Sequence, residues 1–232
     1  MKYDNIVRGE FIERKNRFVA TVRLGGDEVT VHVKNTGRCK ELLVPGAVVY
    51  LVRQDSPGRR TPYDLVAVEK KTKDGTLLIN MDSFAPNIAV GEWLPGGLFS
   101  RDAKIYTERR FGKSRFDFYI EDGTRTAYLE VKGVTLEEDG VVSFPDAPTE
   151  RGVRHLRELE SCLKQGHEAY AVFVIQMDRA RVFMPNGRTH REFEEALCHA
   201  QAAGVKVLAY SCRVAPDSMS IADPVKVRLT GE

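Results

Sequence analysis

The first eighty residues contain short runs of β-branched and apolar residues separated by turn signals. The runs 18–24 and 29–33 flank a Gly-Gly-Asp-Glu segment, which predicts a hairpin. Three more strand-like runs follow, at residues 47–52, 65–68 and 76–81. Short strands with little helix predict a small β-barrel, and we interpret residues 1–83 as an OB-type barrel domain. Periodicity alone leaves an SH3-like barrel open.

The pattern changes at residues 84–100, where prolines and glycines predict an irregular connector. Beyond it, helical and strand patterns alternate, which predicts an α/β domain over residues 84–232 with a mixed sheet flanked by helices. The predicted helices cover 101–111, 151–165 and 190–203, and the predicted strands cover 115–120, 126–132, 169–175 and 205–214. The run 169–175 is apolar throughout, which is typical of a strand buried on both faces between parallel neighbours.

The composition is ordinary for a soluble globular protein, with 42% hydrophobic and 29% charged residues. A formal net charge of +2 is too small to indicate nucleic-acid binding by itself, so a binding surface must come from local arrangement. The four cysteines form no C-x-x-C pair, which argues against a zinc site and predicts reduced thiols. No apolar run resembles a signal peptide or a membrane span, so we expect a cytoplasmic protein with no membrane partner.

One aspartate interrupts a predicted strand. Asp117 lies in the run Phe-Asp-Phe-Tyr-Ile, where burial of a carboxylate is costly unless something compensates for it. On the next predicted strand, Glu130 and Lys132 share one face. With a hairpin turn at residues 122–123, Asp117 lies opposite Tyr128 and diagonal to Glu130, at about 7–8 Å. Two carboxylates at this separation can hold one divalent cation, and we expect Mg²⁺ or Mn²⁺ as cofactor.

These residue types suit phosphodiester hydrolysis. A divalent ion lowers the pKa of a bound water and neutralises charge on the scissile phosphate, while Lys132 can orient that water or stabilise the pentacoordinate phosphorus. The Glu-x-Lys pattern alone is weakly specific, because it occurs three times, starting at Glu13, Glu69 and Glu130. Only the third follows a hairpin-linked aspartate in an apolar run. The alternative interpretation is an exposed sheet face with a surface ion pair.

The chain resembles the sugar fermentation stimulation protein A family over nearly its whole length. The resemblance rests on residues 35–37 (Asn-Thr-Gly), 115–117 (Arg-Phe-Asp), 128–132 (Tyr-Leu-Glu-Val-Lys), 144–152 (Phe-Pro-Asp-Ala-Pro-Thr-Glu-Arg-Gly) and 155–159 (His-Leu-Arg-Glu-Leu). It implies an OB-type domain joined to a PD-(D/E)xK nuclease-like, restriction-endonuclease-like domain. It also implies DNA binding of low sequence specificity and a regulatory role in sugar metabolism.

Residue by residue, the resemblance implies that Asp117, Glu130 and Lys132 form the nuclease motif. It further implies that Glu108, in the predicted helix 101–111, is a supporting acid beside them. The sequence departs from the motif at Phe116, which stands where the motif's proline would be.

Two groups of polar residues are candidate DNA contacts. OB-type barrels bind nucleic-acid strands through basic grooves with aromatic platforms. The candidates in the N-terminal domain are Arg14, Lys15, Arg17, Lys34, Asn35 and Arg38. In the C-terminal domain, Arg151 and His155 lie one helical turn apart, and the family resemblance favours a role at the mouth of the site. The alternatives are a charged barrel face, a simple turn at Asn35 and a solvated helix face.

Three functions are consistent with these features. The leading hypothesis is a DNA-binding protein with a metal-dependent phosphodiesterase centre. A non-catalytic, DNA-binding transcriptional regulator that keeps the fold would bind DNA with steep salt dependence and little need for metal. A small-molecule enzyme that uses the same carboxylates would show no salt-dependent DNA binding.

Overall fold

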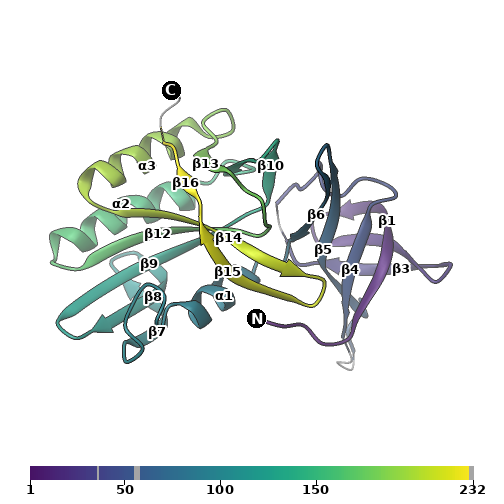
Figure 1. The fold of residues 1–232 in the computed structure, drawn as a ribbon, viewed down its shortest axis with the longest axis horizontal. Coiled ribbons are helices and arrows are strands. Elements are labelled where there is room, and N and C mark those ends of the chain that lie inside the picture. Colours follow the sequence, from purple (N-terminus) through teal and green to yellow (C-terminus); the bar gives the residue numbers. More distant parts are fainter. Residues whose placement is uncertain (36, 55–57, 230–232) are drawn as a thin grey trace.

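The protein folds into two domains that lie side by side, a β-barrel and a larger domain with a mixed sheet (Figure 1). The computed structural model describes residues 1–35, 37–54 and 58–229, so Thr36 of the Asn-Thr-Gly motif lies outside the described residues. None of the helices in these ranges combines the length and the apolar character needed to cross a membrane.

The N-terminal domain is a closed barrel. Its strands are β1 (Ile6–Asn16), β2 (Val19–Leu24), β3 (Asp27–Val33), β4 (Val48–Arg53), β5 (Tyr63–Thr72) and β6 (Gly75–Asn80). Strands β1, β2 and β3 form an antiparallel meander, and β1 also pairs with β4, which pairs with β5. A short parallel pairing between β3 and β5 closes the barrel. This connectivity is that of the predicted OB-type barrel, and β6 extends it by pairing with the second half of β5.

The C-terminal domain is built on a six-stranded mixed sheet. Its strands are β7 (Lys104–Phe111), β8 (Ser114–Asp122), β9 (Arg125–Val134), β12 (Glu168–Ile175), β14 (Lys206–Ala215) and β15 (Ser218–Pro224), in the spatial order β15-β14-β12-β9-β8-β7. The buried strand β12 lies between parallel neighbours β9 and β14, as its apolar run predicts. A smaller sheet contains β10 (Leu136–Glu138), β11 (Val141–Phe144), β13 (Val182–Pro185) and β16 (Lys226–Val227).

Helices cover both faces of the large sheet. Helix α1 (Ala85–Trp93) packs in one hydrophobic cluster with residues such as Leu129 and Val131. Helices α2 (Glu150–Lys164) and α3 (Arg191–Ala203) lie together over the opposite face (Figure 1). The Thr149 hydroxyl caps α2 by accepting a hydrogen bond from the Gly152 N–H at 3.0 Å. Glycine 204 ends α3 at φ 109°, a conformation that favours glycine.

Two sequence predictions for this region are wrong. Residues 101–111 do not form a helix, because strand β7 occupies most of this stretch at the edge of the sheet. Its residues are mostly exposed and charged, as edge strands often are, so it lacks the alternation that identifies a strand. The predicted connector 84–100 contains α1, whose Pro86 lies in the first turn, where proline is tolerated.

Buried polar contacts join the two domains. The backbone N–H of Asn80, at the end of β6, donates to the Gln176 carbonyl at 2.9 Å. The Gln176 side-chain amide in turn donates to Asn80 Oδ1 at 3.0 Å and to the Asp82 carbonyl at 3.1 Å. Closer to the surface, Lys70 of β5 forms a 2.6 Å ion pair with Glu137 of β10. The barrel is therefore fixed to the sheet by directional contacts as well as by the chain connection.

Candidate metal centre and nucleic-acid interface

Asp117 lies where β8 separates from β9. Its neighbours face opposite sides of the sheet, because Phe116 packs against His155 on the α2 side while Phe118 belongs to the α1 cluster. The Asp117 carboxylate fills the gap between the strands. Its Oδ2 accepts a hydrogen bond from the Val131 N–H at 2.7 Å, and its Oδ1 accepts one from Asn87 Nδ2 of α1, also at 2.7 Å. The side chain is thus held by the backbone of β9 on one oxygen and by a side chain of α1 on the other.

The hairpin register differs from the predicted one by two residues. Asp122 pairs with Arg125, so the turn is formed by residues 123–124, and the ladder ends with the pair Phe118–Leu129. Extended by one position, this register sets Asp117 opposite Glu130 itself, not opposite Tyr128. A shift of two residues keeps the paired side chains on their faces, but the ladder ends before Asp117, which reaches β9 through the Val131 N–H instead.

Glu130 is the buried carboxylate of the cluster, with 4% of its surface exposed. Its Oε1 accepts hydrogen bonds from Lys132 Nζ and from His155 Nδ1 of α2. His155 Nε2 accepts from Arg151 Nε at 3.3 Å, which assigns the ring proton to Nδ1. The other oxygen of Glu130, Oε2, is buried and has no hydrogen-bond partner among the described residues.

The two carboxyl groups have opposite pKa shifts. Burial raises the pKa of Asp117 above its ordinary value, and the negative charge of Glu130 raises it further, against the effects of the Val131 N–H, Lys132 and Asn87. Burial by itself would raise the pKa of Glu130 too, but the hydrogen bond from His155 and the positive charge of Lys132 outweigh it, so that pKa is lowered. The pKa of Asp117 therefore depends on the charges of Glu130 and Lys132, and the pKa of Glu130 depends on Lys132 and His155.

These features fit a divalent cation. Glu130 Oε2 is a desolvated oxygen without a donor, and a buried acceptor of this kind is costly unless something satisfies it. Burial and the charge of Glu130 raise the pKa of Asp117, and a cation beside the two carboxylates would offset both effects. Both groups are oxygen donors, which hard cations prefer. Asp117 and Glu130 are the residues that would hold the ion.

Glu108 does not join this cluster. It lies on strand β7, not on a helix, and has a left-handed backbone at φ 57°. Its carboxylate is half exposed and forms a 2.5 Å ion pair with Arg115 Nε. The family resemblance implied that Glu108 lies in a helix beside the cluster. Because this segment is the edge strand β7, the Glu108 carboxylate contacts Arg115 at the surface instead.

His155 does not lie at the surface as predicted for a DNA contact. Only 2% of the residue is exposed, and its ring is held between Glu130 and Arg151. This geometry makes it a positioning residue for the Glu130 carboxylate. Arg151 is exposed at the start of α2 and remains available to a phosphate.

The barrel candidates have different environments. Arg14 donates five hydrogen bonds to the carbonyls of residues 16, 17, 35, 37 and 38, so its guanidinium holds two loops together instead of facing a ligand. Asn35 Oδ1 accepts from the Gly37 N–H at 2.7 Å, which is the simple turn considered as the alternative. Lys34 pairs with Asp82 at 2.7 Å. The exposed residues of the set are Lys15, Arg17 and Arg38.

One residue of the centre and one contact were not foreseen. Asn87 lies in the segment predicted to be an irregular connector, so nothing in the sequence linked it to Asp117. The contact between His155 and Glu130 joins a helix to a strand, and local spacing gives no signal for it. The family resemblance named His155, but as a DNA contact at the mouth of the site and not as a partner of Glu130.

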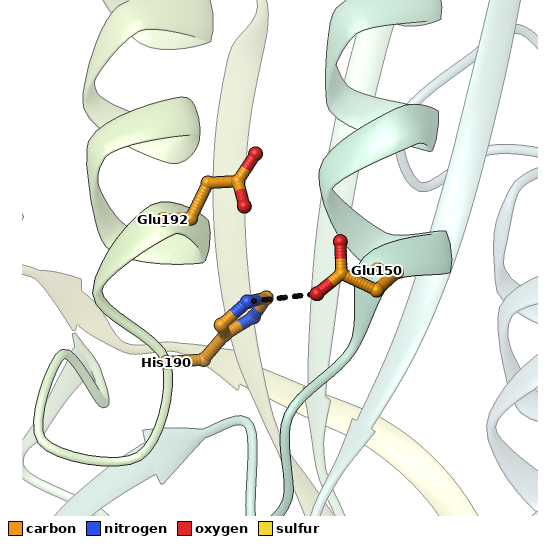
Figure 2. Close-up of side chains that lie close together, drawn as sticks. All are labelled: Glu150, His190 and Glu192. Atoms are coloured by element: carbon orange, nitrogen blue, oxygen red, sulfur yellow. Dashed lines mark ion pairs between the residues drawn. The ribbon is translucent and has the colours of Figure 1, made fainter.

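One further group has the composition of a metal site. Glu150 and Glu192, in the first turns of α2 and α3, flank His190 (Figure 2). His190 Nδ1 accepts a hydrogen bond from the Thr149 N–H at 3.3 Å, so the ring proton is on Nε2, which faces Glu150 at 3.5 Å. Glu192 is engaged by Arg157 at 2.8 Å. The two acids suit the positive ends of their helices, and the histidine has no free lone pair for a cation.

Comparison with known proteins places both domains in one family. The model described as "SfsA N-terminal OB domain" matches residues 12–79, and the model described as "Sugar fermentation stimulation protein RE domain" matches residues 85–218. These matches confirm the predicted fold class of an OB-type barrel followed by a restriction-endonuclease-like domain.

Relatives match the chain from end to end. It is 52% identical over 229 residues to the sugar fermentation stimulation protein homolog of Desulfitobacterium hafniense (strain DSM 10664 / DCB-2), covering 99% of each chain. The homolog of Clostridium beijerinckii is 50% identical over 230 residues, covering 99% of this chain and 100% of that one. The solved structure of Pyrococcus furiosus SfsA in complex with Ca²⁺ superposes with a TM-score of 0.83 at 26% identity, covering 98% of each chain.

Proposed function

We propose, from the premise that the chain belongs to the sugar fermentation stimulation protein family, that it is a DNA-binding protein with a divalent-metal-dependent phosphodiesterase centre. The observation that carries the proposal is the buried Glu130 carboxylate, which has one oxygen without a donor and lies beside Lys132 and Asp117. The P. furiosus relative was solved in complex with Ca²⁺, which supports a divalent cation in this family. We further propose Mg²⁺ or Mn²⁺ as the working ion.

Each side chain of the centre has a distinct task. When bound, the divalent ion supplies Lewis-acid polarisation of a phosphate oxygen and an activated water. Asp117 and Glu130 bind the ion. Asn87 and the Val131 N–H orient the Asp117 carboxylate, and His155 fixes Glu130 by a hydrogen bond to Oε1.

Lys132 supplies the positive charge of the centre. Its ammonium lies against Glu130 Oε1 and is partly exposed, so it can reach a phosphate that approaches the cluster. In that position it can donate a hydrogen bond to the scissile phosphate or orient the attacking water. A preorganised donor of this kind acts where negative charge develops in the transition state.

The DNA-binding part of the proposal depends on exposed basic residues in both domains. Lys15, Arg17 and Arg38 of the barrel, and Arg151 at the start of α2, are exposed. Contacts with phosphates carry no sequence information, so this set supports binding of low sequence specificity. The names of the relatives connect them with stimulation of sugar fermentation. We extend the proposal to a regulatory role in sugar metabolism, exerted on DNA in the cytoplasm.

A cleavage assay with matched variants tests the catalytic part. Labelled single-stranded, duplex and branched DNA is incubated with the protein in Mg²⁺, Mn²⁺ or chelator. We expect metal-dependent cutting that falls by about 10²–10³-fold in Lys132→Ala, the typical loss when a transition-state donor is removed. Glu130→Gln should be at least as impaired. Glu13→Gln is the control, because it alters an exposed Glu-x-Lys pair on β1.

The same experiment separates the two DNA-binding hypotheses. Cutting that survives in Glu130→Gln would show that the cluster is not the catalytic centre. DNA affinity that falls steeply with salt, with no cutting on any substrate and no effect of metal, would identify a non-catalytic binding protein. Absence of salt-dependent DNA binding would leave only the small-molecule enzyme.

A further inference from the structure

Two exposed aromatic rings of the protein each have a cationic side chain lying over them. Phe18, between β1 and β2, is 42% exposed and has the Arg17 guanidinium 4.6 Å from its ring centre. Phe84, at the start of α1, is 65% exposed and has Lys34 Nζ 5.6 Å from its ring centre. A ring with one free face and a neighbouring cation is what proteins offer to a nucleotide, because the base stacks and the phosphate is attracted.

The Phe84 ring stands on a rigid base. The Phe84 N–H donates to Asp82 Oδ1 at 2.9 Å, and Asp82 is almost completely buried. The other oxygen of Asp82 accepts from Lys34 Nζ at 2.7 Å, and the Ser83 N–H donates to the Lys34 carbonyl at 2.8 Å. Backbone and cation are therefore fixed before any ligand arrives, which reduces the entropy lost when a base stacks.

A short chain of contacts connects the segments that carry the two rings. The Phe18 carbonyl accepts a hydrogen bond from the Val33 N–H at 2.8 Å, and the next residue, Lys34, is the one that lies over Phe84. This path of contacts thus runs from the open end of the β2–β3 hairpin to the first turn of α1. The exposed cation Arg38 belongs to a loop that Arg14 holds by hydrogen bonds, and the exposed Lys15 follows Arg14 on β1.

The path ends at the candidate metal centre. One turn after Phe84, Asn87 donates to Asp117 Oδ1 at 2.7 Å. The next residue, Ile88, is 48% exposed and donates its N–H to the Phe84 carbonyl. Two apolar side chains therefore flank the helix residue that touches the candidate metal ligand, on the side open to solvent.

We propose that Phe18 with Arg17, and Phe84 and Ile88 with Lys34, form an aromatic track that binds unpaired bases of a nucleic-acid strand and leads the strand to Asp117. The inference deepens the proposed function, on which it rests, by naming the substrate class as single-stranded or locally unpaired DNA. Bases in an intact duplex are already stacked on one another, so the rings discriminate against it. The basic residues beside the track contact the phosphates.

The test measures binding without cutting. Full-length protein in chelator is titrated into a fluorescein-labelled single-stranded oligodeoxyadenylate and, separately, into a labelled blunt duplex of equal length. We expect Phe84→Leu, which stays apolar but cannot stack, to weaken single-strand binding by about fivefold or more. Phe84→Trp should retain the affinity. Duplex affinity should change by less than about twofold in both variants, since phosphate contacts dominate it.

Tyr106→Leu is the matched control, because Tyr106 is a 40% exposed aromatic residue on β7 whose hydroxyl donates to Glu121, outside the track. Unchanged single-strand affinity in Phe84→Leu, with the parent still binding DNA, would overturn the track and leave the proposed function standing. Equal losses on single strand and duplex would also overturn it. A parent protein that binds neither DNA would contradict the proposed function itself.

Discussion

The candidate metal centre predicts a change in stability that can be measured without a substrate. Mg²⁺ or Mn²⁺ added to chelator-treated protein should raise the melting temperature, because Asp117 and Glu130 are brought together only in the folded chain. A ligand at 100 times its Kd stabilises the folded state by about 2.7 kcal/mol. For a chain of 232 residues each kcal/mol corresponds to about 2–4 °C, so we expect an increase of roughly 5–11 °C.

Two isosteric variants should abolish this increase. In Asp117→Asn, the new side-chain oxygen can still accept from the Val131 N–H, and the Asn87 amide can turn to accept from the new amide. In Glu130→Gln, the side-chain oxygen can still accept from His155. Both variants keep the packing and lose one charge of the pair. Glu13→Gln, on the exposed face of β1, should respond to metal like the parent.

The effect of pH has a definite sign. The pKa of Asp117 is raised in the folded protein, so this group favours folding below its ordinary pKa and loses that contribution as pH rises through its folded-state pKa. Above that folded-state pKa the charged Asp117 therefore opposes folding. Metal-free Asp117→Asn should accordingly be more stable than the parent at neutral pH. The gain from metal should increase as pH rises across the same range.

Thermal scans of parent and variants, with metal and with chelator from mildly acidic to neutral pH, provide the measurement. An equal metal-induced shift in the parent, Asp117→Asn and Glu130→Gln would refute the assignment of these two ligands. The absence of any shift in the parent at millimolar metal would refute the centre as a whole.

Two other substitutions test the contacts that hold the site. His155→Ala removes a hydrogen-bond donor from the buried Glu130 carboxylate and should lower the free energy of unfolding, measured in urea, by about 1–3 kcal/mol. The control Arg157→Ala, on the exposed face of α2, should change that free energy by less than about 0.5 kcal/mol. Equal effects of the two variants would contradict the positioning role of His155. Arg14→Ala removes five hydrogen bonds to backbone carbonyls and should lower the free energy of unfolding by about 2–3 kcal/mol. Backbone amides in the loop that contains Arg38 should then exchange their hydrogens faster, and unchanged exchange would contradict the role of Arg14 in holding that loop.

Much of the fold could be predicted because burial leaves a periodic signal. The hairpin of β2 and β3 and the fully buried β12 follow from alternation and from an unbroken apolar run. Strands β1 and β7 could not be recognised from the sequence pattern, because their exposed faces carry many charged residues. In β1 only Phe11 is fully buried. Helix α1 escaped because it has nine residues with no polar face regular enough to mark it.

The candidate site could be predicted only in part. The turn was misplaced by two residues, and Asp117 reaches β9 through the Val131 N–H beyond the end of the paired ladder, a contact that strand alternation does not predict. The partners of these carboxylates could not be predicted, since Asn87 and His155 come from helices whose docking depends on tertiary packing. Basic residues were recognised by type, but type does not distinguish a guanidinium that faces solvent from one that, like Arg14, is surrounded by carbonyls.

The buried amide contact between Asn80 and Gln176 has a consequence for the products of any cleavage. Because this contact fixes the barrel to the sheet, we expect the distance from Phe18 to Asp117 to vary little. A DNA strand bound at the barrel would then be cut at a fixed number of nucleotides from its binding site on the barrel. Fragments would show a discrete size, and loosening the junction through Gln176 would blur it.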